Sequence, residues 1–252
     1  MNFQSFLDEL EKRHLADLRF SEVTRALRAL SSAYVERRES ALADHKALDG
    51  AGKRAAFAMY YGPLHFLLVE HIIKTIGVSL GPGPVVDLGC GTGVAGAAVA
   101  RQGLGGDAQK PLRVLGFDTH PWTLDEARFT YRAFGLHSDV RRAHAARVRF
   151  PADTSIVVAA FVVNELKDAD RTELLQNLTR NREPGTRNHV LIVEPISQRI
   201  SPWWDDWAGE FTRIGGRADV WKARLDVPPP VKRLAKASGL RPEMLTARSL
   251  YV

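Results

Sequence analysis

The stretch from Val85 to Gly93 constrains the fold of this chain more than any other. It reads Val-Val-Asp-Leu-Gly-Cys-Gly-Thr-Gly, so two β-branched residues lead to an acid and three glycines alternate at positions 89, 91 and 93. Small residues that favour a helix follow from Val94 to Ala100. Glycine lets the backbone adopt positive φ and approach a ligand closely, and a helix N-terminus offers free N–H groups. The stretch therefore predicts a strand, a tight turn and a helix, with the edge of a nucleotide-like ligand at the turn.

Later segments have the pattern of further strands separated by polar, helix-forming stretches. The run from Ser155 to Val163 is almost continuously apolar, which is typical of a strand buried on both faces of a parallel sheet. Other strands are expected at residues 111–118, within 140–148, at 189–195 and within 241–252. We therefore predict an α/β fold with a doubly wound, mostly parallel sheet.

The first 80 residues have a different character from the rest of the chain. Phe6, Leu7 and Leu10 recur at helical spacing, and no strand pattern is present before Gly81-Pro82-Gly83-Pro84, a stiff linker. We expect a helical cap over residues 1–80 and a ligand-binding domain over residues 81–252. Tyr60, Tyr61 and His65 lie in the last helical stretch of the cap and are candidates for a lid over the ligand. The alternative is that the tyrosines pack against the sheet and His65 is an ordinary core or surface histidine.

The glycine stretch, written D-x-G-x-G-x-G, resembles the first motif of class I S-adenosylmethionine-dependent methyltransferases. The resemblance implies that Asp87, Gly89, Gly91 and Gly93 bind S-adenosylmethionine. Asp118 ends the next strand, where a doubly wound fold places an acid for ribose hydroxyls. Methyltransferases often carry an acid after the third strand for the adenine amino group, and His144 occupies that position here. The usual seven-stranded sheet also implies a C-terminal hairpin, whose seventh strand is either missing or drawn from the insertion after residue 200.

Chemistry in open α/β sheets takes place beyond the carboxyl ends of the strands. Phe161, Asn164 and Glu165 follow the apolar run and are expected near the point of methyl transfer, with Phe161 counted among the cofactor's neighbours. Asn164 is a candidate to orient an acceptor, and Glu165 to take its proton. The alternative is that Asn164 caps a helix and Glu165 pairs with a basic neighbour.

Three segments are similar to the methyltransferase-like family of the mitochondrial and bacterial ribosomal small subunit. They are residues 55–58 (Ala-Ala-Phe-Ala), residues 161–166 (Phe-Val-Val-Asn-Glu-Leu) and residues 191–195 (Leu-Ile-Val-Glu-Pro). Mitochondrial members carry a cysteine cluster, and this chain has one cysteine. The resemblance implies an RNA acceptor, and the formal net charge of +6, with its excess after residue 140, agrees with a polyanionic partner.

Two other functions stay open beside RNA methylation. The tryptophans at 203, 204 and 207 favour methylation of a small, perhaps aromatic metabolite if they line its site, although they could equally fix a helix to the core. A ribosome-assembly factor that binds the cofactor without catalysis is the third hypothesis. No metal is expected, no apolar run is long enough for a membrane span, and a single cysteine fits a cytoplasmic location. The oligomeric state is left open.

Overall fold

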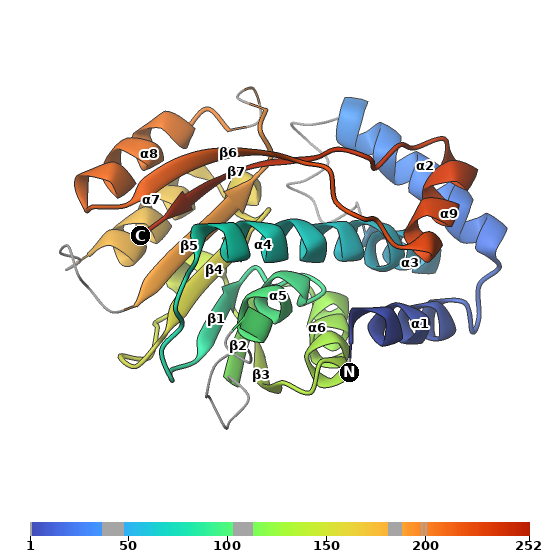
Figure 1. Cartoon of the computed structure of the whole chain (residues 1–252), viewed down its shortest axis with the longest axis horizontal. Helices are drawn as coiled ribbons and strands as arrows, with labels where there is room; N and C mark the ends of the chain where they lie inside the picture. The colour runs from blue at the N-terminus through green and yellow to red at the C-terminus, as the bar shows by residue number, and fades with distance from the viewer. Residues whose placement is uncertain (1, 37–47, 103–112, 181–187, 198, 200) are drawn as a thin grey trace.

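In the computed structural model, the described residues form one seven-stranded sheet in the order β3-β2-β1-β4-β5-β7-β6 (Figure 1). The structure describes residues 2–36, 48–102, 113–180, 188–197, 199 and 201–252. β1 to β5 are parallel, and β7 runs antiparallel between β5 and β6. The strands are β1 Val85–Leu88, β2 Arg113–Asp118, β3 His137–Arg142, β4 Ile156–Ala160, β5 His189–Glu194, β6 Arg217–Ala223 and β7 Leu245–Tyr251.

The sheet confirms the predicted fold class and decides the question of the seventh strand. β6 comes from the insertion after residue 200, and it pairs with β7 over its full length from Arg217 to Ala223. The third strand begins at His137, earlier than expected, because the alternation of apolar residues is weak where β3 forms the exposed edge of the sheet. The predicted end of the first crossover helix, at residues 103–106, lies outside the described residues.

Helices cover both faces of the sheet and form the N-terminal segment. After the sheet begins, the helices are α5 Val94–Gln102, α6 Pro121–Ala133, α7 Asp168–Thr179, α8 Trp204–Arg213 and α9 Pro229–Ser238, with short 3₁₀ turns η4 Ala145–Arg147 and η5 Val163–Glu165. The N-terminal segment holds α1 Phe3–His14, α2 Phe20–Glu36, α3 Ala51–Ala56, the π-helical turn η2 Phe57–Tyr61 and α4 Gly62–Ile76. α2, α3 and α9 gather at one end of the molecule (Figure 1).

Proline suits the first turn of a helix, so Pro63 predicts a helix start. The helix starts earlier, because α3, η2 and α4 follow one another without a break from Ala51 to Ile76. A proline inside a helix removes one backbone hydrogen bond and crowds the preceding turn. The π turn before Pro63 accommodates it, and the Gly62 N–H donates to the Phe57 carbonyl. Single π turns inside helices occur often at functional sites, and this one faces the cavity described below.

Alternate residues of the central strands point to opposite faces of the sheet, as strand geometry requires. Val85, Ile156 and Leu191 pack in a core with α4, α5 and α6. The residues that follow them, Val86, Val157 and Ile192, pack in a second core with α7 and α8 on the other face. Trp203, Trp204 and Trp207 are buried in that second core. The tryptophans therefore anchor α8 to the sheet and do not line the ligand cavity.

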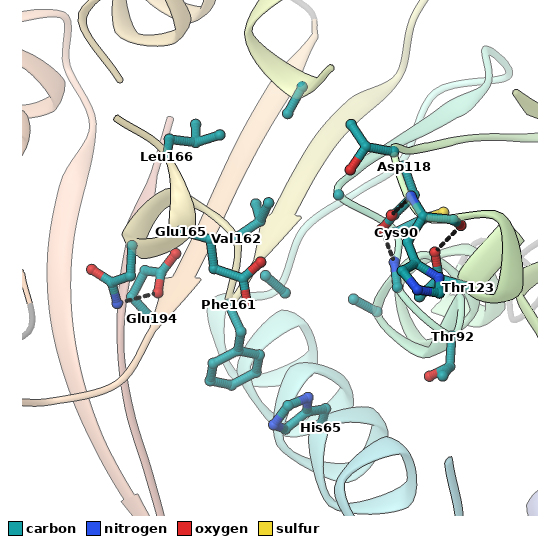
Figure 2. A pocket seen from close by; sticks show the side chains of 18 of the residues that line it. His65, Cys90, Thr92, Asp118, Thr123, Phe161, Val162, Glu165, Leu166 and Glu194 are labelled. Atoms are coloured by element: carbon teal, nitrogen blue, oxygen red, sulfur yellow. Dashed lines mark hydrogen bonds between the residues drawn. The ribbon is translucent and has the colours of Figure 1, made fainter. Parts of the chain in front are cut away.

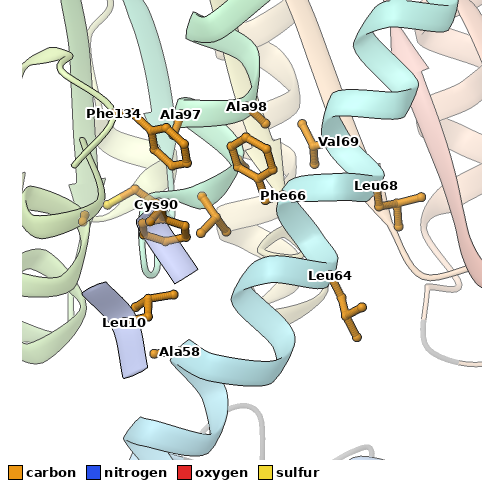
Figure 3. Close-up of a cluster of buried hydrophobic side chains, with 14 of the residues drawn as sticks. Leu10, Ala58, Leu64, Phe66, Leu68, Val69, Cys90, Ala97, Ala98 and Phe134 are labelled. Atoms are coloured by element: carbon orange, nitrogen blue, oxygen red, sulfur yellow. The ribbon is translucent and has the colours of Figure 1, made fainter. Parts of the chain in front are cut away.

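The N-terminal segment shares its core with the sheet domain. The Phe134 ring lies 4.8 Å from the Phe6 ring and 5.1 Å from the Phe66 ring between centroids, and Figure 3 shows Leu10, Phe66 and Phe134 in this cluster. A polar contact also joins the two parts of the chain: the buried Glu126 carboxylate of α6 accepts a hydrogen bond from the Arg13 Nε–H at the end of α1. The predicted boundary after residue 80 falls in the loop between α4 and β1, and apolar packing crosses it.

Candidate functional site

A cavity of about 600 Å³ lies at the carboxyl ends of β1, β2, β4 and β5 (Figure 2). This is the edge where the strand order reverses between β1 and β4, the usual ligand site of doubly wound sheets. The cavity has two halves. The loops after β1, β2 and β3 line the half that we call the cofactor half, and the loops after β4 and β5 together with η2 and α4 line the half that we call the acceptor half.

The three glycines after β1 all have positive φ, but they serve different purposes. Their φ angles are 58° at Gly89, 51° at Gly91 and 80° at Gly93. A Cβ at Gly89 would lie 2.1 Å from Val162 Cγ2, so this glycine lets the loop pack against the end of β4. A Cβ at Gly91 would meet no atom closer than 3.9 Å. Gly91 therefore borders open space in the cavity, and a side chain there would occupy room for a ligand.

Asp87 and Gly93 were expected to touch the cofactor, yet neither lies among the residues that line the cavity. Asp87 is buried, and its Oδ2 accepts hydrogen bonds from the Gly96 N–H at 2.9 Å and the Tyr131 O–H at 2.7 Å. Burial raises the pKa of Asp87 to about 7. This carboxyl ties the start of α5 to α6, so it shapes the glycine loop from behind.

Asp118 lines the cavity at the end of β2, as the sequence predicts. Its Oδ2 accepts the Gly91 N–H and its Oδ1 accepts the His120 N–H, both at 2.9 Å. A carboxylate has about four lone-pair positions. Asp118 therefore keeps capacity for two ligand hydroxyls while it holds the glycine loop in place.

Two buried polar atoms in the cofactor half have no hydrogen-bond partner among the described residues. They are Thr92 Oγ1 and His144 Nδ1, and both residues line the cavity. His144 Nε2 lies 3.7 Å from Asp170 Oδ2 on α7, which leaves Nδ1 as the free ring nitrogen. Unpaired buried polar atoms are rare. Together with the open space at Gly91 and the free lone pairs of Asp118, they fit a polar nucleoside-like ligand. The pattern D-x-G-x-G-x-G gives no role to Thr92, and only the tertiary contact identifies Asp170.

Aromatic rings form one wall of the acceptor half. The His65 ring of α4 stacks on the Phe161 ring, with centroids 3.9 Å apart and planes 20° apart (Figure 2), and Phe57 and Tyr61 of η2 line the same end. Phe161 is the one described non-glycine residue with positive φ, at 60°; such strain clusters at functional sites. Burial lowers the pKa of His65 to about 4, so its ring is neutral at physiological pH. Tyr61 and His65 therefore lie where a lid is expected, whereas Tyr60 is in the core.

Asn164 lines the cavity, but its amide group is already engaged at both ends. Its Nδ2 donates to Glu194 Oε2 at 2.6 Å, and its Oδ1 accepts from Trp203 Nε1 at 3.0 Å. The Val163 N–H donates to Glu194 Oε1 at 2.7 Å. Burial raises the pKa of Glu194 to about 8, against these hydrogen bonds. Asn164 does not cap a helix; it fixes the η5 turn to the end of β5, so it positions its neighbours.

Glu165 lines the cavity next to this network, and its carboxyl group points into the open space between Phe161 and the cofactor half (Figure 2). No described residue makes a hydrogen bond or ion pair with that carboxyl group, so the predicted alternative of a basic partner is wrong for this part of the chain. Burial, and secondarily the charge of Asp118, raises the pKa of Glu165 to about 8. Because the side chain is open to the cavity, the full rise applies once a ligand has displaced the water.

Comparison with known proteins identifies the class. Residues 85–185 match the family model described as a methyltransferase domain. The fold is similar to that of a proposed O-methyltransferase from Nostoc punctiforme, with a TM-score of 0.52, 16% identity and coverage of 92% of this chain and 69% of that one. It is also similar to mitomycin 7-O-methyltransferase, with a TM-score of 0.51, 14% identity and coverage of 92% and 66%. No curated protein matches the sequence significantly.

A third solved structure is that of the Pyrococcus abyssi tRNA (uracil-54, C5)-methyltransferase in complex with S-adenosyl-L-homocysteine. It has a TM-score of 0.44 and 16% identity, and the match covers 73% of this chain but only 38% of that protein. The matched domain and the sheet order, without that third structure, give the chain an S-adenosylmethionine-dependent methyltransferase domain of the class I fold.

Two properties of the described residues bear on metal and membrane binding. Among the described residues, no group of three or more His, Cys, Asp or Glu side chains is arranged to hold a metal ion. In the same part of the chain, none of the helices combines the length and the apolar character needed to span a bilayer.

Proposed function

We propose that the protein methylates a small acceptor enclosed in the acceptor half of the cavity. The observation that carries this proposal is the aromatic wall: Phe57, Tyr61 and His65 come from the N-terminal segment and face Phe161 across the end of β4. An enclosed, mainly apolar pocket with a few polar groups is typical of small-molecule sites. The wall excludes water and aligns the acceptor, which is what a displacement at a methyl group needs from the protein.

In the cofactor half, we assign the ribose hydroxyls to Asp118 and the adenine amino group to His144 Nδ1. Gly91 leaves room for the cofactor to approach the loop, and Thr92 Oγ1 offers a further polar contact. When bound, S-adenosylmethionine supplies an electrophilic methyl group on a positively charged sulfur. Asp87 and Gly93 act through the loop, because they hold its shape without reaching the cavity.

Charge favours a small acceptor over RNA. Among the described charged residues that line the cavity, four are carboxylic acids, Asp118, Glu165, Asp170 and Glu194, and one is basic, Lys167. Three arginines of the basic second half of the chain form ion pairs with acids on their own elements: Arg141 with Asp139, Arg213 with Glu210 and Arg217 with Asp219. A polyanion would have to compete with these partners.

The two O-methyltransferase-like neighbours lend the proposal further support. Each covers 92% of this chain, and residues 81–252 make up only about two thirds of it, so the shared fold includes N-terminal helices. The name of one neighbour gives mitomycin as the molecule that it methylates. We take an N-terminal helical roof over a class I sheet as an arrangement suited to small acceptors.

Transfer of a tritiated methyl group tests the proposal directly. The protein would be incubated with labelled S-adenosylmethionine and, in parallel, with total RNA and with a protein-free small-molecule extract. We expect label in the small-molecule fraction. The Gly91→Val variant serves as the background control, because it fills space in the cofactor half. Label in RNA alone would overturn the proposal in favour of RNA methylation, and no transfer to either would favour the assembly-factor hypothesis.

A further inference from the structure

We propose that the acceptor is an arylalkylamine that carries its positive charge into the cavity, and that Glu165 is the residue that binds this nitrogen and receives its proton. The proposal rests on the proposed function, since it names the chemical class of the small acceptor. It draws on three independent features: an unpaired carboxyl group, a wall of neutral aromatic rings, and an excess of acidic over basic side chains among the described residues that line the cavity.

The unpaired carboxyl group is the first feature. Both oxygens of Glu194 already accept hydrogen bonds, from Val163 and Asn164, and Arg248 lies opposite Glu194 in the β5–β7 pairing. Glu165 has no such partner in the described part of the chain, although its carboxyl group points into the cavity (Figure 2). Once ligands displace water from the cavity, a carboxylate without a partner is unfavourable. An ammonium group supplies both the opposite charge and the hydrogen-bond donors that Glu165 lacks.

The aromatic wall is the second feature. The rings of Phe57, Tyr61, His65 and Phe161 line the acceptor half and pack against one another. Aromatic faces attract cations, most strongly where water is excluded. Because His65 is neutral, it adds no positive charge that would repel an ammonium group. The wall therefore suits a planar apolar body that carries a cationic group.

The charges at the rim are the third feature. Lys167 is exposed and is the one described lysine or arginine among the lining residues, whereas Asp170 stands on the same side of the cavity. A carboxylate or phosphate acceptor would enter against Glu165, Glu194 and Asp118 without a buried cation to meet it. This arrangement disfavours acidic acceptors and leaves amines and neutral hydroxyl compounds as the alternatives.

The reaction balances with Glu165 as the proton acceptor. The amine first gives up one ammonium proton to the Glu165 carboxylate, which frees the nitrogen lone pair. That lone pair forms the new nitrogen–carbon bond as the sulfur–carbon bond of S-adenosylmethionine breaks, and the bonding electron pair returns to sulfur. The positive charge thus passes from sulfur to the methylated nitrogen. The positive charge stays near the carboxyl groups that line the cavity. The proton leaves Glu165 for solvent when the product departs.

A matched set of probes tests the amine assignment through binding alone. Calorimetry would measure 2-phenylethylamine, 2-phenylethanol and phenylacetate against the protein saturated with S-adenosyl-L-homocysteine. We expect the amine to bind at least roughly tenfold more tightly than the alcohol, about 1.4 kcal/mol, and phenylacetate to bind least. Glu165→Gln should abolish the preference for the amine. Glu173→Gln, the same substitution on an exposed face of α7, should leave it unchanged.

The affinity for the amine should also depend on pH. The pKa of Glu165 is raised above that of an ordinary glutamate, so its carboxyl group ionises as the pH rises through that raised value, while an alkylammonium with a pKa near that of lysine, about 10.4, stays charged. We therefore expect tighter binding of 2-phenylethylamine at the higher pH, and a shallower dependence in Glu165→Gln. The other charged groups facing this position are Asp118, Glu194, Asp170 and Lys167, and Glu194 accounts for any slope that remains in the variant.

Two results would overturn the amine assignment and leave the proposed function standing. One is equal affinity for the alcohol and the amine. The other is an amine preference that survives in Glu165→Gln. If none of the three probes binds although S-adenosyl-L-homocysteine does, the arylalkylamine assignment is wrong, and the labelled-methyl assay decides separately whether any small molecule is the acceptor.

Discussion

The two halves of the cavity are built in different ways. The cofactor half is made largely of backbone and short side chains from consecutive residues, with Gly89, Gly91 and Thr92 in one loop and Asp118 at the end of the neighbouring strand. The acceptor half is made of side chains from η2, α4, η5 and β5. The first and the last of these elements are more than a hundred residues apart in the chain. The cofactor half therefore depends on the local conformation of one loop, and the acceptor half depends on how distant elements pack together.

This difference indicates how each half can vary. A glycine loop tolerates almost no change, because each glycine has a backbone conformation that other residues adopt only with strain. Side chains on the acceptor wall can be exchanged as long as the helices beneath them keep their packing. Substitutions in the cofactor half should therefore affect every reaction of the protein, and substitutions in the acceptor half should affect one class of acceptor.

The largest effect is expected for Gly91→Val. The new side chain would project into open space of the cavity, and its φ of 51° would be strained. We expect affinity for S-adenosyl-L-homocysteine to fall by roughly a hundredfold or more, about 3 kcal/mol, by calorimetry. Gly135→Val is the matched control: Gly135 has φ of 70° and no neighbour within 4 Å, yet it lies outside the cavity lining. An equal loss of affinity in both variants would attribute the effect to strain alone.

The next effect concerns the aromatic wall. Tyr61→Ala removes a ring that lines the acceptor half and leaves the glycine loop unchanged. We expect affinity for 2-phenylethylamine to fall roughly tenfold, in line with about 1.4 kcal/mol for a lost aromatic contact. Affinity for S-adenosyl-L-homocysteine should change less than about twofold. Tyr61→Phe, which keeps the ring, should restore binding of the amine; a parallel loss of both ligands would show that the two halves are not separable.

A smaller effect is expected at His144 in the cofactor half. If its unpaired Nδ1 accepts a hydrogen bond from the adenine amino group, His144→Ala should weaken binding of S-adenosyl-L-homocysteine by roughly fivefold, since one hydrogen bond contributes about 1 kcal/mol. His144→Asp, which offers another acceptor, should recover part of the loss. His137→Ala, at an exposed position of β3, is the control. Unchanged affinity in His144→Ala would contradict the adenine assignment.

The smallest effect is expected on the outer surface. Arg141 is 67% exposed in its side chain and is paired with Asp139, and exposed ion pairs contribute about 0–1 kcal/mol. Reversing the charge of Arg141 and Arg142 to Glu should leave methyl transfer to the small-molecule fraction unchanged and independent of salt. A steep salt dependence that drops by about one unit of log–log slope for each lost contact would instead support RNA.

Local sequence patterns predict most of the cofactor half. D-x-G-x-G-x-G, the acid at position 118 and the apolar run before residue 161 together predicted the strand–turn–helix, the parallel sheet and the cofactor class. The same pattern did not distinguish residues that touch the ligand from residues that support them. Asp87 and Asp118 are both acids near the end of an apolar strand, so the sequence does not distinguish them. In the structure, Asp87 points into the core toward Gly96 and Tyr131, whereas Asp118 lines the cavity.

The sequence by itself determined the fold class, because continuous apolar runs and glycine turns are local properties that each segment carries alone. Tertiary structure decided the rest. It drew the seventh strand from the insertion, buried the three tryptophans under the sheet, and brought His65 against Phe161 across almost a hundred residues. It also engaged Asn164 with Glu194 and left Glu165 without a partner in the described chain. Which polar groups remain unpaired depends on contacts between distant segments, and a linear pattern contains no record of those contacts.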